Sequence, residues 1–119
     1  MMKMNTVLIL GTAMLIGSGA VQAHTHLEKA VPADNSVVTS PPAQIMLHFS
    51  EAARLTALSI QKDGDKEAKA VSALPKEAAE ELSVPVAALA PGKYVVNWRV
   101  VGDDHHVMSG ALHFTVTGK

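Results

Sequence analysis

The sequence predicts an all-β fold, a single antiparallel β-sandwich that follows a cleaved amino-terminal segment. Apolar residues recur at every second position over most of the chain after residue 23, which is the side-chain period of a β-strand. Turn-forming residues separate these alternating runs at short intervals. The 119-residue chain has no cysteine, so one small domain, residues 24–119, must be held together by its apolar core alone.

Residues 1–23 have the pattern of a secretory signal peptide. A basic start at Lys3 precedes an apolar run from Val7 to Ile16, and small residues lead to a cleavage-type ending at Ala23. An uncleaved membrane anchor is the rival interpretation, but the run is about half of the roughly 20 residues that span a bilayer. A cut after Ala23 makes His24 the first residue of the mature protein, whereas a cut after Ala20 would leave it internal.

The alternating runs define the expected strands. A proline at position 85 indicates that the third of them is an edge strand, and residues 76–81 look helical, as a single turn within a connection. Many short strands with turns between them are typical of an immunoglobulin-like antiparallel sandwich with Greek-key connections. The expected strands are Ile45–Phe49, Leu58–Ile60, Leu82–Val86, Tyr94–Val101 and Ala111–Val116.

Composition excludes several classes of function. The formal net charge of −1 argues against a nucleic-acid partner, because no basic patch is available to neutralise phosphates. The absence of cysteine excludes thiolate metal sites. Of the six methionines only Met46 and Met108 follow residue 23, so there is no thioether cluster of the kind that selects Cu(I).

Two groups of residues could hold a metal ion together. The α-amine and the imidazole of an amino-terminal His24 can close a chelate ring on one ion. In extended backbone Asp104 and His106 point to the same side, because residues two apart share a face. The combined set of three nitrogens and one oxygen suits Cu(II), with zinc as the main competitor. The alternative is that residues 103–106 form an ordinary solvated turn that binds no metal.

Several segments of the chain carry a resemblance to a known family: His24–Leu27, Val31–Asp34, Leu47–Glu51, Pro91–Val101, Asp104–His106 and Ser109–Val116. Through them the chain resembles the CopC family of periplasmic copper-binding, copper-resistance proteins over essentially its whole length after residue 23. The resemblance implies the same β-sandwich and one Cu(II) per chain, held by His24, Asp104 and His106. It also implies a role in copper homeostasis beside an inner-membrane partner of the CopD type.

The chain departs from the family pattern at two places. Some members have a methionine-rich loop that holds Cu(I), and residues 52–67 contain no methionine here. The chain is therefore similar to the branch with a Cu(II) site only. The second departure is His105, which we expect to be exposed, although it could rival His106 as a ligand.

The sequence leaves the roles of His26 and Glu51 at the metal site open. A free terminus with histidine third can bind Cu(II) through its amine, two backbone amides and the imidazole of His26. The apolar residues that follow favour early entry into a strand, so we expect His26 near the metal but not bound to it. Glu51 could orient a ligand histidine. His48 and His113 alternate with core residues and are expected to face outward as ordinary surface histidines.

These observations predict a monomeric periplasmic Cu(II) carrier or buffer and not an enzyme. The rival is an oxidative copper enzyme, because lytic polysaccharide monooxygenases also use an amino-terminal histidine. Those enzymes grip a polymer with exposed aromatic residues, and here the aromatic residues occupy inward positions of the expected strands. A purely structural adhesion-type sandwich is disfavoured by the histidine-rich ends. The aromatic residues are Phe49, Tyr94, Trp98 and Phe114.

Overall fold

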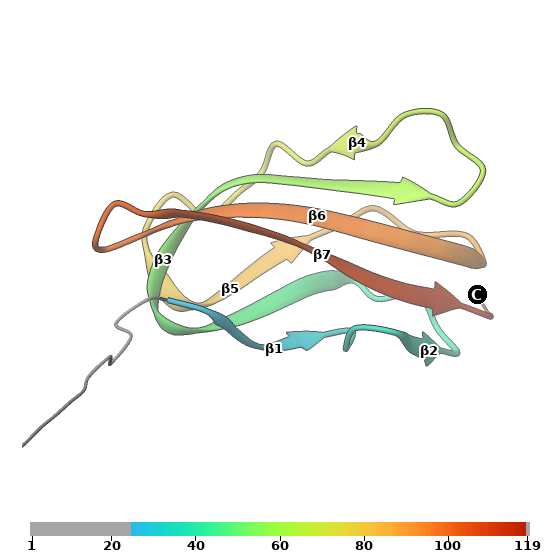
Figure 1. Cartoon of the computed structure of the whole chain (residues 1–119). Helices are drawn as coiled ribbons and strands as arrows, with labels where there is room; N and C mark the ends of the chain where they lie inside the picture. The colour runs from blue at the N-terminus through green and yellow to red at the C-terminus, as the bar shows by residue number, and fades with distance from the viewer. Residues whose placement is uncertain (1–24, 119) are drawn as a thin grey trace, which may run out of the picture.

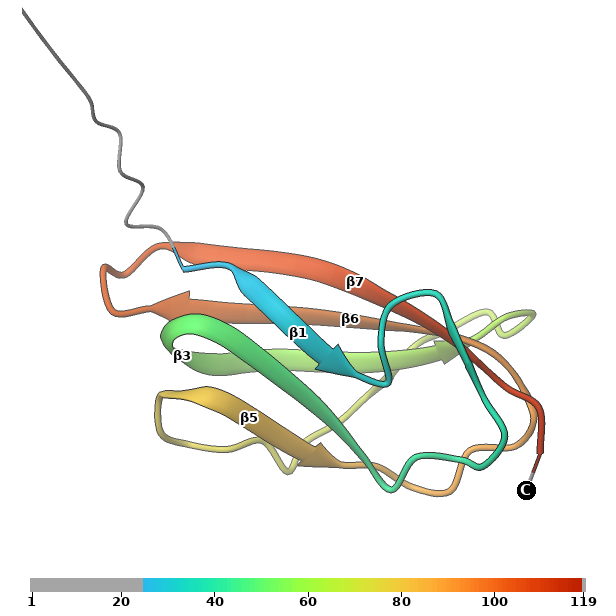
Figure 2. The same cartoon turned by 90° about the horizontal axis from the view of Figure 1, so that it is seen from below.

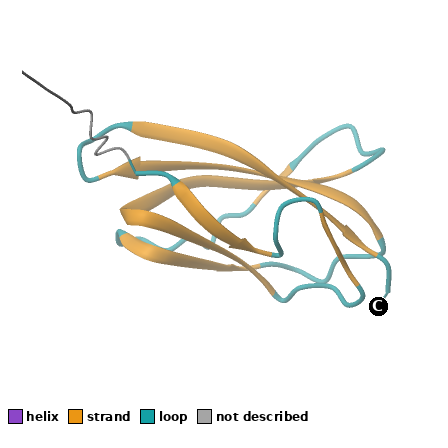
Figure 3. Ribbon diagram, turned by 60° about the horizontal axis from the view of Figure 1, so that its bottom comes forward, coloured by secondary structure: helices purple, strands orange, loops and turns teal. Residues whose placement is uncertain are grey.

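The computed structural model describes residues 25–118, and all regular structure in this range is β-strand (Figures 1 and 3). No helix among these residues is long and apolar enough to cross a membrane. The strands are β1 (Leu27–Val31), β2 (Ser36–Val38), β3 (Gln44–Lys62), β4 (Lys69–Ala70), β5 (Ala79–Pro85), β6 (Gly92–Gly102) and β7 (Val107–Val116).

The long strand β3 belongs to both layers of the sandwich. Its first half pairs with β1 on one side and β5 on the other, and its second half pairs with β4 and β6. β6 continues to β7, and β7 to β2. The sheet therefore curls on itself at β3, which bends sharply at one end of the molecule (Figures 1 and 2). The predicted all-β sandwich is confirmed.

Three details differ from the sequence prediction. The strands expected at 45–49 and 58–60 are parts of one strand, because Ala53 and Leu55 are also buried and register shifts in the pairing let the chain bend without ending. Residues 76–81 form no helical turn, since residues 79–81 already belong to β5. The pairing of β2 with β7 is parallel, whereas all other pairs are antiparallel. Pro85 lies in β5, whose one partner among the described strands is β3, as predicted for an edge.

The core forms where the inward positions of the two layers meet. All four aromatic side chains are buried, as their alternation predicted. Trp98 meets Phe49 edge to face with ring centres 5.3 Å apart, and Tyr94 stacks on Phe114 at 5.6 Å. The Tyr94 hydroxyl donates a hydrogen bond to the Ala90 carbonyl at 2.5 Å, a contact that resembles the tyrosine corner of immunoglobulin-like domains.

Candidate metal centre

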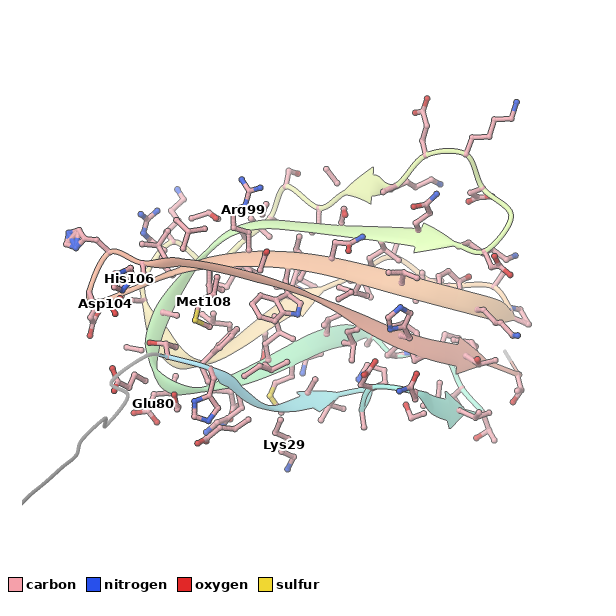
Figure 4. All side chains as sticks on the ribbon, viewed as in Figure 1. Lys29, Glu80, Arg99, Asp104, His106 and Met108 are labelled. Carbon is pink, nitrogen blue, oxygen red and sulfur yellow. The ribbon has the colours of Figure 1, made fainter. Side chains whose placement is uncertain are left out.

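The candidate site lies on the tight hairpin between β6 and β7. The Gly102 amide donates to the His106 carbonyl and the His105 amide to the Gly102 carbonyl, each at 3.0 Å. His105 has a φ of 67°, in the left-handed region. A turn that ends in one left-handed residue is a common form of three-residue hairpin loop. This backbone places the hairpin loop at one end of the sandwich, where Asp104 and His106 are labelled in Figure 4.

Asp104 and His106 contact each other through both main chain and side chain. The His106 amide donates to Oδ1 of Asp104 at 3.1 Å, and Oδ2 of Asp104 lies 2.7 Å from Nδ1 of His106. The hydrogen bond from the His106 side chain, followed by the one from its amide, holds the pKa of Asp104 below its usual value. The carboxylate is therefore ionised at neutral pH. Both side chains remain solvent-accessible, at 38% for Asp104 and 66% for His106.

The start of the described chain packs against the same hairpin. Thr25 is 4% exposed. A side chain at Gly102 would place its Cβ 3.0 Å from the Thr25 hydroxyl oxygen and 3.1 Å from Oδ1 of Asp104. Because Gly102 has no side chain, the side chains of Thr25 and Asp104 can both pack against its backbone. This contact, which sequence reasoning missed, fixes the residue after His24 beside the hairpin.

His26 is fixed to the adjacent strand by its main chain. Its amide donates to the Ser50 hydroxyl at 3.0 Å, and its carbonyl accepts from the Ser50 amide at 2.9 Å. β1 then begins at Leu27, as expected for a chain that enters a strand almost at once. The imidazole of His26 lies 3.9 Å from the Glu28 carboxylate. Ser50, which lies between Phe49 and Glu51 on β3, therefore holds the backbone of His26 in place.

The structure brings together two of the three predicted ligands. His24 lies outside the described residues, so its position relative to Asp104 and His106 stays a prediction. Within residues 25–118 no group of three or more His, Asp or Glu side chains is arranged to hold a metal ion. His105 is exposed, as predicted. Glu51 is exposed on β3, and its predicted help to a ligand histidine stays a prediction.

The chemistry of the pair fits a tetragonal metal ion. Two adjacent donors each about 2.0 Å from an ion at right angles lie roughly 2.8 Å apart. The 2.7 Å between Nδ1 of His106 and Oδ2 of Asp104 is close to that value, so the two atoms could become neighbouring ligands of one ion if the imidazole turned its lone pair from the carboxylate to the metal. An imidazole and a carboxylate provide one nitrogen and one oxygen, and a complete site needs further donors from elsewhere in the chain.

Comparison with known proteins places the chain in a family. The chain is 38% identical over 113 residues to protein YobA of Escherichia coli K12, covering 91% of this chain and 89% of YobA. It is 32% identical to copper resistance protein C of Pseudomonas syringae pv. tomato, covering 92% and 93% of the two chains. The crystal structure of CopC from Methylosinus trichosporium OB3b superposes with a TM-score of 0.67 at 27% identity, covering 80% of this chain and 95% of that one. The model of the CopC domain matches residues 27–117, and the chain therefore belongs to the CopC family.

Proposed function

We propose that this protein is a periplasmic Cu(II)-binding protein of copper resistance. One Cu(II) per chain is held by the α-amine and imidazole of His24, the carboxylate of Asp104 and the imidazole of His106. The observation that carries the proposal is the 2.7 Å pair of Asp104 and His106 on a hairpin against which Thr25 packs. A relative 32% identical over almost the whole chain bears the name copper resistance protein C.

The position of Thr25 supports the part given to His24. One peptide bond separates the two residues, and consecutive Cα atoms lie about 3.8 Å apart. Thr25, the residue bonded to His24, itself lies beside Gly102 and Asp104. Signal-peptide cleavage after Ala23 would free the amine of His24, the residue before Thr25. The amine and imidazole then complete a set of three nitrogens and one oxygen, which Cu(II) favours.

We infer that this site binds copper and does not catalyse an oxidative reaction. Oxidative copper enzymes that act on polymers need an exposed surface, commonly aromatic, to grip their substrate. Here all four aromatic residues of the chain are in the core. We infer a carrier or buffer that works as a monomer and transfers copper to an inner-membrane partner of the CopD type.

Selectivity for Cu(II) over Cu(I) follows from the ligand types. Cu(I) prefers soft thioether and thiolate donors. The loop from β3 to β4 contains no methionine, and the chain has no cysteine. Reduction of bound copper should therefore release it. A stoichiometric complex that survives a strong Cu(I) chelator would contradict this part of the proposal.

A chelator competition on the mature protein tests the function directly. Protein isolated from the periplasm is checked by intact mass for a start at His24, and Cu(II) is then titrated against a competing chelator. We expect one tightly bound Cu(II) in the wild type and in His113→Ala, and a loss of at least about tenfold in His106→Ala. A wild type that binds no Cu(II), or binds it equally well after His106→Ala, would overturn the site.

A further inference from the structure

The strand that follows the candidate metal hairpin has one long open edge. β7 pairs with β6 along its whole length. On its other side β2 pairs only with residues 114–116, and β7 forms the border of its layer in Figure 2. Residues 107–112 therefore have no neighbouring strand on that side within the described chain, and they begin directly after His106.

The hydrogen bonds of His113 show which backbone groups point to this edge. The His113 amide donates to Oδ1 of Asp34 at 2.8 Å, and the His113 carbonyl accepts from the Asn35 amide at 2.6 Å. Both backbone groups of His113 thus point away from β6. In an antiparallel strand the direction of these groups repeats at every second residue.

The backbone of Val107, Ser109 and Ala111 consequently faces the open edge. Among residues 25–118 no hydrogen bond to the N–H and C=O groups of these three residues is found on that side. Their side chains are exposed on the outer face of the layer, and Val107 is 62% exposed. Another extended chain therefore finds unpaired donors and acceptors here, as at any free edge of a sheet.

The open edge lacks the features that usually protect such an edge. Proteins prevent edge pairing with charged side chains, proline or a covering element. The edge strand β5 contains Glu80, Glu81 and Pro85. Residues 107–112 read Val-Met-Ser-Gly-Ala-Leu and contain neither charge nor proline. The two edges are thus built differently, and the edge of β7 is the one suited to pairing.

The side chains of this segment are complementary to a second copy of the same segment. In an antiparallel pair with a two-fold axis at Ser109, Val107 lies opposite Ala111 of the other copy, and Met108 lies opposite Gly110. Each larger side chain thus meets a small one, and no like charges are opposed. The outward backbone groups of residues 107, 109 and 111 then exchange about six hydrogen bonds.

We propose that the free edge of β7 binds the same edge of a second copy of this chain, in a two-fold antiparallel pair centred on Ser109. One short strand pair is a small contact, of the size found in transient complexes. The pair therefore forms at high concentration and separates on dilution, which leaves a monomer to carry copper. The inference goes beyond the proposed function and does not depend on bound metal.

Charge reversal at Ser109 tests both the pairing and its register. Sedimentation of the copper-free mature protein from micromolar to millimolar concentration should show a reversible dimer. Ser109→Lys and Ser109→Glu should each lose the dimer, because the axis places two like charges directly opposite one another. An equimolar mixture of the two variants should restore the dimer, since each lysine then faces a glutamate.

Asn97→Lys is the matched control. Asn97 is exposed on β6 opposite Ala111, so it shares the outer face but lies one strand away from the edge. A lysine there should leave the dimer intact. A wild type that stays monomeric throughout, a dimer that survives Ser109→Lys, or a dimer lost in Asn97→Lys would overturn the proposal.

Hydrogen exchange of the wild type is a second measurement that needs no variant. The amides of Val107, Ser109 and Ala111 should exchange rapidly in dilute protein and more slowly in concentrated protein. Slow exchange at every concentration would mean that the chain itself covers the edge, and this outcome also contradicts the proposal.

Discussion

Asp104 contacts His106 through both of its oxygens, one at the amide and one at Nδ1 of the ring, at 3.1 and 2.7 Å. The two contacts fix the imidazole relative to the hairpin before any metal arrives. An ion that bound here would meet a preformed pair and would not need to order two separate side chains. The same contacts keep Asp104 ionised, because they hold its pKa below the usual value.

Replacing Asp104 by Asn should weaken Cu(II) binding by at least the roughly 10–100-fold that the loss of an outer-shell partner of a metal ligand typically costs. Asn keeps the size of the side chain and loses the charge, so the hairpin should persist while the anionic donor disappears. Chelator competition on Asp104→Asn measures the change. His105→Ala, which alters an exposed residue of the same loop, is the control and should keep the wild-type affinity. Equal losses in both variants would mean that the loop, and not the carboxylate, sets the affinity.

A methionine retained before His24 should severely weaken Cu(II) binding. The extension removes the free α-amine from His24, so the chelate ring through the amine and the imidazole can no longer form there. Affinities of the native and the methionine-extended proteins are compared in the same competition assay. Intact mass confirms the two amino termini. If the two affinities agree, the chelate at His24 is refuted.

The Cu(II) affinity should fall steeply below about pH 6. The metal needs a neutral amine and neutral imidazoles, whose reference pKa values are about 7.7–8.0 and about 6.5, so up to three protons compete with it. Asp104 should add nothing to this slope, because its pKa is lowered and it stays ionised throughout that range. Competition assays between pH 5 and pH 8 give the slope.

The rival amide mode at His26 predicts a different result in the variants. Binding through the amine, two backbone amides and His26 would survive both Asp104→Ala and His106→Ala. Copper spectra of those two proteins therefore separate the modes. Spectra and affinities identical to the wild type would assign the metal to the terminal tripeptide.

The buried positions of the strands were predictable from the alternation of apolar and polar residues alone. Ile45, Leu47 and Phe49 are fully buried, because a period of two in an amphipathic strand leaves one arrangement that hides the apolar face. The continuity of β3 was not predictable in this way, since a bulge changes the period locally while the strand goes on. The parallel pairing of β2 with β7 joins two segments that are far apart in the sequence, and no local pattern encodes such a pairing.

The site shows the same division between local and distant information. Asp104 and His106 meet because they are two residues apart in one hairpin, and this spacing is visible in the sequence. The packing of Thr25 on Gly102 joins segments almost 80 positions apart. The lack of a side chain at position 102 is the one local sign of that close approach.

Asp34 should stabilise the fold in a pH-dependent manner. Its Oδ1 accepts a hydrogen bond from the His113 amide at 2.8 Å, and this bond is the main cause that lowers the pKa of Asp34 below 3.8. A carboxylate whose pKa is lower in the folded state stabilises that state above the unfolded pKa, and the stabilisation is lost as the pH falls through the folded value. Thermal unfolding of wild type and Asp34→Asn should differ at pH 7, and the difference should vanish as the pH falls through the lowered pKa of Asp34. A difference that is constant with pH would contradict the assignment.

Gly110→Ala should destabilise the protein by about 1–3 kcal/mol, the usual cost of overpacking a core. A Cβ at position 110 would lie 2.4 Å from Cζ2 and 2.8 Å from Cε2 of Trp98. The indole is 7% exposed and also packs against Phe49, so the ring has little room to move. Denaturant unfolding measures the loss, and the emission of Trp98, the one tryptophan of the chain, reports its displacement.

Ser109→Ala is the control for Gly110→Ala, because residue 109 is exposed on the same strand and should change stability little. A double-mutant cycle with Trp98→Phe then isolates the contact itself. The smaller Phe ring should make room for the new methyl group, so the double variant should be less destabilised than the sum of the two single variants. Strict additivity would mean that the cost of Gly110→Ala arises in the backbone of β7 and not from the indole of Trp98.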